Sequence, residues 1–294
     1  VAKGFMDRDR GSFPTEVPTP HKESTRLVLY ICVECQWVPV KDDAARAFLQ
    51  SGRLRKFKRT VYLEPPPEAN IPKGWVWLAL RSIYGLDDGP YEWLLELHGI
   101  LISLGMVRLS SDLTIYVLPK SGFEKLPLDV RHFRGCVHGV LDAHMDDLLW
   151  GGDLEMAKMM VALRKRVLIG TTETGNLMHL GLRLNTIYDA NGKFHLRQSQ
   201  QAYVESIDEP VISRERALQT TEKLQDREYA EYRSVLGQIM WHAVSLAFWL
   251  AFEASFLSSR AADPLVEDLL ELRKAVRKAH KFKGESLKFV QLGE

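Results

Sequence analysis

The spacing of apolar residues predicts several helices. After Gly89 and Pro90, leucines recur every three or four positions, which is the period of one helix face, and Gly105 ends the run. Asp153 can cap a second helix, whose apolar positions from Met156 to Val167 follow the same period. Further along, the pattern predicts helices over 198–207, 229–251 and 264–283, the last of them amphipathic with a basic end.

Runs of β-branched and aromatic residues predict the strands. We expect them over 26–33, 60–63, 114–118, 136–144, 148–150 and 178–184. The three prolines 65–67 stop the second of these strands. The order of elements favours an α+β fold, with an antiparallel sheet that carries helices on one face. A second, mainly helical region is expected to start near residue 199.

Composition narrows the class of protein. The 294 residues are 46% hydrophobic and 26% charged, which is typical of a globular protein and excludes disordered, collagen-like and disulfide-rich chains. Lys and Arg number 39 against 38 Asp and Glu, so the average charge gives no sign of a nucleic-acid partner. Basic clusters at 53–59 and 273–283 nevertheless leave local phosphate binding open.

The cysteines and the most apolar run predict a protein that is not secreted and has no membrane partner. Cys32 and Cys35 form a C-x-x-C without a second ligand pair, so we interpret both as buried strand thiols rather than zinc ligands. No leader follows Val1, which argues against secretion. The run 239–252 is shorter than the roughly 20 residues of a bilayer span and contains His242, which favours a core helix.

Asp146 and Asp147 are the most informative residues. They lie between two apolar strands, where a tight turn can present at least one carboxylate, or both, to a common edge. Adjacent like charges favour a hard divalent cation such as Mg²⁺ between them. An Asp-Asp pair is also typical of a solvated turn, so the pair alone leaves both interpretations open.

The surrounding motifs favour the metal site. The matching segments, in chain order, are 1–5 (VAKGF), 43–49 (DAARAFL), 61–66 (VYLEPP), 83–86 (IYGL) with Pro90 and Trp93, 112–116 (DLTIY), 144–147 (HMDD), Leu180 with Gly181, and Tyr232 and Arg233 with Gly237. Their identity and order resemble those of the reverse transcriptases of copia-type retrotransposons. The resemblance covers nearly the whole chain.

This resemblance implies a right-hand polymerase fold with fingers, a ferredoxin-like palm and a helical thumb. The implied boundaries are 1–42 and 50–85 for the fingers, 43–49 and 86–198 for the palm, 199–262 for the thumb and 263–294 for the start of a connection region. The implied activity is RNA-directed DNA synthesis on an RNA or DNA template with a DNA primer and deoxynucleoside triphosphates. The rest of a retrotransposon polyprotein is a further expected partner, and the implied location is intracellular, in a cytoplasmic particle or the nucleus.

The resemblance also assigns the catalytic site. Asp43 and Asp146 match the family's two main metal ligands and Asp147 its supporting acid, for two Mg²⁺ or Mn²⁺ ions. Among the nucleotide contacts, Phe48 matches an aromatic residue under the incoming sugar, although a core phenylalanine is the alternative. Lys3 and Ala44 lie in matched motifs and are expected to contact the nucleotide too.

Nucleic acid is expected to contact local patches. Five basic residues, Arg53, Arg55, Lys56, Lys58 and Arg59, suit a hairpin near template phosphates or, equally, a solvated basic face. By resemblance, Leu180 and Gly181 open the primer grip. Gly237 and Trp241 would lie on a thumb helix in the minor groove, although a core tryptophan is at least as good an interpretation.

Two acids near the matched residues are not expected to bind metal. We interpret Asp42 as a solvated neighbour of Asp43. Asp142 shares the strand face of His144 and Asp146, about 13 Å from Asp146, and is expected to be an exposed acid.

Departures from the family's pattern support a second hypothesis. The chain starts just after the family's basic K-A-R, Tyr91 stands where an arginine is common, and residues 245–249 replace T-R-P-D. No ribonuclease H acid set follows. These features suggest a fragment or a decayed copy, so the alternative is an inactive, polymerase-like relic that at most binds nucleic acid. A generic metal-dependent phosphohydrolase is a third and weaker interpretation.

Overall fold

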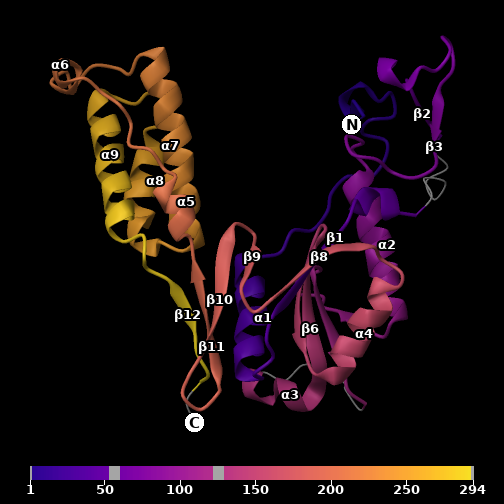
Figure 1. The fold of residues 1–294 in the computed structure, drawn as a ribbon. Helices are drawn as coiled ribbons and strands as arrows, with labels where there is room; N and C mark the ends of the chain where they lie inside the picture. Colours follow the sequence, from indigo (N-terminus) through magenta and orange to yellow (C-terminus); the bar gives the residue numbers. More distant parts are fainter. Residues whose placement is uncertain (1, 53–59, 122–128, 293–294) are drawn as a thin grey trace. The chain divides into compact units, whose positions relative to one another are not determined.

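The computed structural model describes residues 2–52, 60–121 and 129–292. The chain divides into two compact units. The first comprises residues 1–179, 188–195 and 290–294, and the second comprises Leu180–Ile187 and Leu196–Phe289. Figure 1 shows the helices and strands of both units.

An antiparallel sheet of six strands forms the centre of the first unit. Its order is β4–β5–β6–β7–β1–β8. These strands are β1 (Val40–Ala44), β4 (Val107–Arg108), β5 (Ile115–Pro119), β6 (Val137–His144), β7 (Asp147–Gly152) and β8 (Ile169–Thr174). The predicted strands over 114–118, 136–144 and 148–150 are confirmed as β5, β6 and β7.

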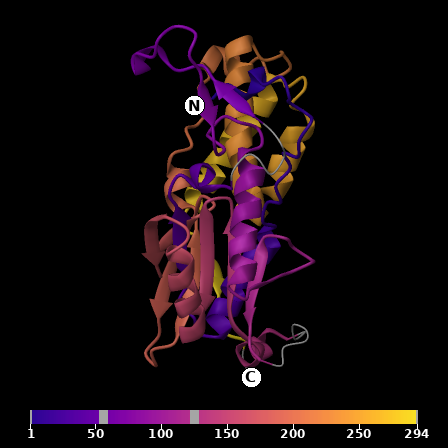
Figure 2. The same cartoon turned by 90° about the vertical axis from the view of Figure 1, so that its right-hand side faces the viewer.

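Two helices cover one face of this sheet (Figure 1, Figure 2). They are α2 (Gly89–Ser103) and α4 (Leu154–Arg164), as the leucine and methionine spacing predicted. Trp93, Leu97 and Leu101 of α2 pack with Met156 and Met160 of α4 in one core against the sheet. The Asp153 side chain accepts hydrogen bonds from the backbone N–H groups of Glu155 and Met156, which confirms the predicted cap.

A third helix packs on the opposite face, where the sequence predicted a strand. Residues 26–33 belong to α1 (Lys22–Glu34), so the strand prediction was wrong. The buried positions include Thr25, Val28, Leu29 and Cys32, which follow the helical spacing, and tertiary packing outweighs the strand preference of their β-branched neighbours. α1 packs on β5 and β6 through a core that includes Val28, Ile31 and Cys32.

The two cysteines of the C-x-x-C motif are buried thiols, as expected, but not in a strand. Cys32 lies within α1 and Cys35 is its C-cap residue; both are free. Burial raises the pKa of both thiols, that of Cys35 to about 11.

Shorter elements complete the first unit. β2 (Val61–Leu63), which confirms the prediction for 60–63, forms a hairpin with β3 (Trp77–Ala79). The other short elements are η1 (Gly4–Met6), η2 (Ala47–Gln50), η4 (Pro67–Ala69), η5 (Val130–His132), α3 (Phe133–Cys136) and β9 (Leu177–His179).

The predicted strand over 178–184 is interrupted. Leu180 and Gly181 both adopt positive φ values, of 50° and 72°, so β9 ends before them and β10 (Leu182–Tyr188) begins after them. β8 was missed because most of its residues are polar and only partly covered, so they carry no apolar alternation.

The second unit combines short strands with a helical core. β12 (Leu287–Phe289) pairs antiparallel with β11 (Phe194–Ser199), and β10 lies on the other side of β11. The helices are α5 (Gln201–Glu205), α6 (Arg214–Ala217), α7 (Asp226–Ser245), η6 (Phe248–Leu250), α8 (Ala251–Ser259) and α9 (Val266–Lys281).

Helices α7, α8 and α9 share one core, which includes Tyr232, Ile239, Leu257 and Leu272. The amphipathic helix predicted for 264–283 is confirmed as α9. The single helix expected over 229–251 is wrong at its end, because α7 stops at Ser245 and the chain turns there before α8. Among the described residues, no helix is both long enough and apolar enough to cross a bilayer.

Candidate metal and nucleotide site

Strand pairing brings the three predicted aspartates to one edge of the sheet. Asp43, near the end of β1, is the direct antiparallel partner of Asp147, the first residue of β7. The backbone N–H of Ala44 donates to the carbonyl oxygen of Asp146 at 2.8 Å. Residues about 100 positions apart in the sequence are therefore neighbours.

A tight turn presents Asp146. His144 pairs with Asp147 across the hairpin, which leaves Met145 and Asp146 as a two-residue loop. Met145 has a φ of 55° whereas Asp146 does not have a positive φ, a combination that is characteristic of a type II′ turn. The indole N–H of Trp93, on α2, donates to the carbonyl oxygen of Met145 at 2.7 Å. This contact holds the strained residue from outside the hairpin.

The electrostatics of the site favour a cation. Burial raises the pKa of Asp43, the carboxylates of Asp146 and Asp147 raise it further, and Lys41 opposes them. Mg²⁺ and Mn²⁺ prefer carboxylate oxygens as ligands, and a cation would relieve the repulsion between these carboxylates. The chemistry of these residues therefore fits a divalent ion. Within the described ranges, however, no three His, Cys, Asp or Glu side chains converge closely enough to hold an ion together.

Lys41 is a site residue that the sequence reasoning missed. Its ammonium nitrogen lies 2.8 Å from Oδ1 of Asp147, and the two side chains are only 13% and 22% exposed. Lys41 precedes Asp43 by two residues in β1, so the two side chains point to the same face of the sheet. This period of two was the sequence signal that could have identified it.

Asp42 was expected to be solvated, and the structure corrects this. Its side chain is fully buried and points to the opposite face from Asp43. Nη2 of Arg164 lies 2.8 and 2.9 Å from its two oxygens, and Trp150 and Thr172 also donate to it. Asp42 therefore joins β1, β7, β8 and α4, a role that depends on residues far away in the sequence.

Asp142 was expected to be an exposed acid, and this is also wrong. It is fully buried under α1 and accepts a hydrogen bond from Oγ1 of Thr25 at 2.6 Å. Burial raises its pKa to about 7, the Thr25 hydrogen bond lowers it, and the nearby Asp112 raises it. The expectation failed because α1 was taken for a strand, which removed the helix that covers this position.

Two of the three expected nucleotide contacts, Phe48 and Lys3, lie beside the turn-forming segment 83–86. The centroids of the Phe48 and Tyr84 rings are 4.8 Å apart, and Phe48 also packs against the main core. Both interpretations of Phe48, a sugar contact and a core phenylalanine, therefore stay open. The backbone N–H groups of Ala2 and Gly4 donate to Tyr84 and Gly85, which brings the exposed Lys3 to the same segment. Ala44 is buried in the core below Asp43.

Two of the expected nucleic-acid contacts meet in the second unit. A side-chain carbon added to Gly181 would lie 3.6 Å from the Trp241 ring, and Trp241 is 37% exposed. Gly237 lies one turn earlier on α7, is exposed, and has open space around it. Leu180 precedes Gly181 in the same turn. The basic cluster Arg53, Arg55, Lys56, Lys58 and Arg59 lies outside the described residues.

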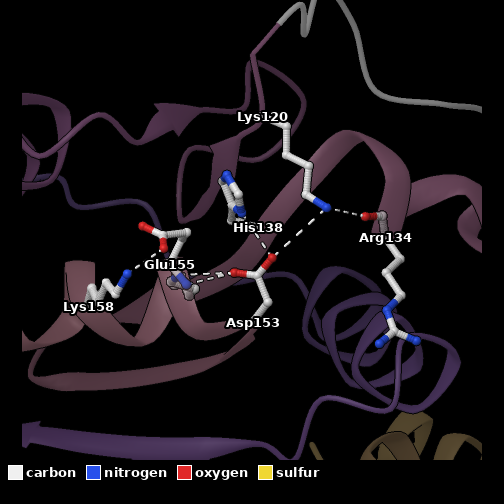
Figure 3. Close-up of polar contacts among 7 residues, drawn as sticks. Lys120, Arg134, His138, Asp153, Glu155 and Lys158 are labelled. Carbon is white, nitrogen blue, oxygen red and sulfur yellow. Dashed lines mark hydrogen bonds and ion pairs between the residues drawn. The ribbon is translucent and has the colours of Figure 1, made fainter.

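A second polar cluster lies at the far end of β6 and β7 from the aspartates (Figure 3). Nδ1 of His138 is 2.9 Å from the capping carboxylate of Asp153, and Lys120 donates to the carbonyl oxygen of Arg134 at 2.7 Å. Because Asp153 is already engaged at the start of α4, this cluster has a structural role there.

Comparisons with known proteins support part of this picture. No family model matches the chain. The chain is 32% identical over 124 residues to the Retrovirus-related Pol polyprotein from transposon RE1 of Arabidopsis thaliana, and 33% identical over 124 residues to that from transposon RE2. Each match covers 41% of this chain and 8% of the relative. These similarities support a retrotransposon Pol-derived region in the chain.

Proposed function

We propose that the chain is the RNA-directed DNA polymerase domain of a copia-type retrotransposon. The observation that carries this proposal is the pairing of Asp43 with Asp147 beside the Ala44–Asp146 hydrogen bond. It brings acids from separate strands to one edge, as two-metal nucleotidyl transfer requires. The similarity to Pol polyproteins supports the same class of protein.

The proposed architecture is a right-hand polymerase of the α+β class. Residues 1–42 and 50–85 would form fingers, 43–49 and 86–198 the palm, 199–262 the thumb, and 263–294 the start of a connection. The division of the chain near residues 180–196 supports a boundary between palm and thumb. Helix α9 packs in the same core as α7 and α8, so this part of the connection is one body with the thumb.

In this function Asp43 and Asp146 would hold two Mg²⁺ or Mn²⁺ ions, and Asp147 would support them. The ions, when bound, would lower the pKa of a primer 3′-hydroxyl and neutralise the triphosphate. Phe48 would exclude a ribose 2′-hydroxyl and Lys3 would contact the deoxynucleotide, whereas Ala44 is buried and would only support Asp43 from the core. Gly181 and Trp241 would contact the template-primer duplex in the second unit.

Extension of a DNA primer on an RNA template tests this proposal. Purified protein should incorporate deoxynucleotides with Mg²⁺ or Mn²⁺, and Asp43→Asn and Asp146→Asn should reduce incorporation to background. Glu155→Gln, which alters an exposed acid paired with Lys158, is the control and should keep full activity. Equal incorporation by all four proteins would refute the proposal.

The second candidate is an inactive relic that still binds nucleic acid. The ion pair between Lys41 and Asp147, and the lack of three convergent ligands among the described residues, favour this candidate. It predicts salt-sensitive binding of a template-primer duplex, with log K falling by about 0.7 to 0.9 per phosphate neutralised as log salt rises, and no incorporation. A flat salt response would count against any nucleic-acid role.

A further inference from the structure

The protein itself supplies positive charge at one of the three carboxylates. Nζ of Lys41 lies 2.8 Å from Oδ1 of Asp147, whereas no ion pair is found for Asp43 or Asp146 within the described part of the chain. Both partners of the pair are largely covered, so solvent screens their attraction less than it does at an exposed pair. Lys41 is held by its strand on the face that carries Asp43.

Other basic groups also surround Asp147. His144 is its cross-strand partner, and His179 of β9 is 2% exposed. Asp147 favours the charged form of His179, but burial dominates and lowers the pKa of this histidine to about 4, so the ring is neutral at pH 7. Among the described residues, Lys41 is the basic group that forms an ion pair with Asp147.

We propose that Lys41 is a built-in competitor for divalent metal at Asp147. Its ammonium neutralises this carboxylate, and among the described residues the three acids do not converge as ligands of one ion. Binding of an ion by Asp147 requires displacement of Lys41. The inference rests on the proposed metal site and concerns its regulation, because the pair raises the concentration of metal at which Asp147 becomes a ligand.

Direct binding of Mn²⁺, followed by electron paramagnetic resonance at fixed pH, tests the proposal without relying on activity. Lys41→Met removes the charge and keeps most of the chain length. It should tighten Mn²⁺ binding about tenfold, because a full positive charge a few ångströms from the ion is lost. Lys41→Arg keeps the charge and should bind Mn²⁺ as weakly as the natural protein.

Two further variants isolate the effect. Asp147→Asn in the Lys41→Met background should abolish the gain, since the ammonium acts through that carboxylate. Lys158→Met, which breaks the exposed pair with Glu155, removes one positive charge elsewhere in the same unit and should leave Mn²⁺ affinity unchanged.

The outcomes separate this inference from the proposed function. Unchanged Mn²⁺ affinity in Lys41→Met, with measurable binding by the natural protein, would overturn the role of Lys41 and leave the metal site intact. No binding by either protein, or binding that survives Asp43→Asn together with Asp146→Asn, would overturn both. Far-ultraviolet circular dichroism of each variant checks folding, and if Lys41→Met misfolds, Lys41→Gln replaces it with the same expected gain.

Discussion

Trp93 donates its indole N–H to the carbonyl oxygen of Met145 at 2.7 Å, and so connects helix α2 to the turn that carries Asp146. Trp93 is 1% exposed, and Met145 has a positive φ of 55°. A bulky residue in this conformation persists only where neighbouring groups stabilise it. The contact therefore makes Trp93 a positioning residue for Asp146, although it would touch neither metal nor nucleotide.

Replacing Trp93 with phenylalanine tests this role. The ring still fills the core, but the Met145 carbonyl loses its donor, so we expect a loss of about 1 to 2 kcal/mol in the free energy of unfolding. Incorporation should fall about 10- to 100-fold, because a displaced turn misplaces Asp146. Mn²⁺ affinity, measured in parallel, should fall as well, which a purely structural loss elsewhere would not cause.

Trp249→Phe is the matched control. The Trp249 indole nitrogen is buried and has no hydrogen-bond partner within the described residues. Removing it breaks no hydrogen bond, so urea unfolding should report a smaller loss than for Trp93→Phe. Equal losses in the two variants would argue against the proposed importance of the Trp93–Met145 bond.

The sequence predicted which acids meet, but not how their surroundings are built. Motif order and the hairpin pattern correctly brought Asp43, Asp146 and Asp147 to one sheet edge. The environment of Asp42 could not be predicted, because its partner Arg164 lies 122 residues away and side-chain burial depends on the tertiary fold. Local preference also misled at 26–33, where packing on the sheet selects a helix.

The loss in the free energy of unfolding should depend on which partner of the buried Asp42–Arg164 pair is removed. Asp42 is fully buried, whereas the Arg164 side chain is 34% exposed. Arg164→Met leaves a buried carboxylate without its main partner and should cost about 3 to 5 kcal/mol in urea unfolding. Asp42→Leu should cost less, because the freed guanidinium can turn toward water.

The double variant completes this cycle. Asp42→Leu with Arg164→Met should recover part of the loss, since no uncompensated charge stays buried. The exposed pair of Lys158 and Glu155 is the control, and its disruption should cost less than about 1 kcal/mol. Strictly additive losses for Asp42 and Arg164 would mean that the two side chains do not interact.

The raised pKa of Asp142 predicts that the stability of the protein depends on pH. Its pKa is raised from 3.8 to about 7 in the folded protein, mainly by burial. Because the pKa is raised in the folded state, the contribution of Asp142 to the free energy of unfolding is fully present below pH 3.8 and is lost as pH rises through 7. The shift corresponds to at most about 4 kcal/mol between these limits.

Asp142→Asn removes the titration and keeps an acceptor for Thr25. Urea unfolding should therefore show that the variant gains stability relative to the natural protein as pH rises from 5 to 9. Glu155→Gln, at an exposed position, should show no such trend. A constant difference between Asp142→Asn and the natural protein across this range would contradict the raised pKa.

Asp43 should lower the stability of the metal-free protein. Burial and the carboxylates of Asp146 and Asp147 raise its pKa, so its charged form is disfavoured in the folded state, and the associated penalty grows as pH rises through the folded pKa. Asp43→Asn removes this repulsion and should raise the free energy of unfolding at pH 8 by a few tenths to about 1 kcal/mol without metal.

Saturating Mn²⁺ should make the natural protein more stable than Asp43→Asn, because the natural protein alone then gains binding energy in the folded state. Thermal unfolding with and without Mn²⁺ measures both, and a variant that is less stable without metal would show that the acids do not repel one another across this sheet edge.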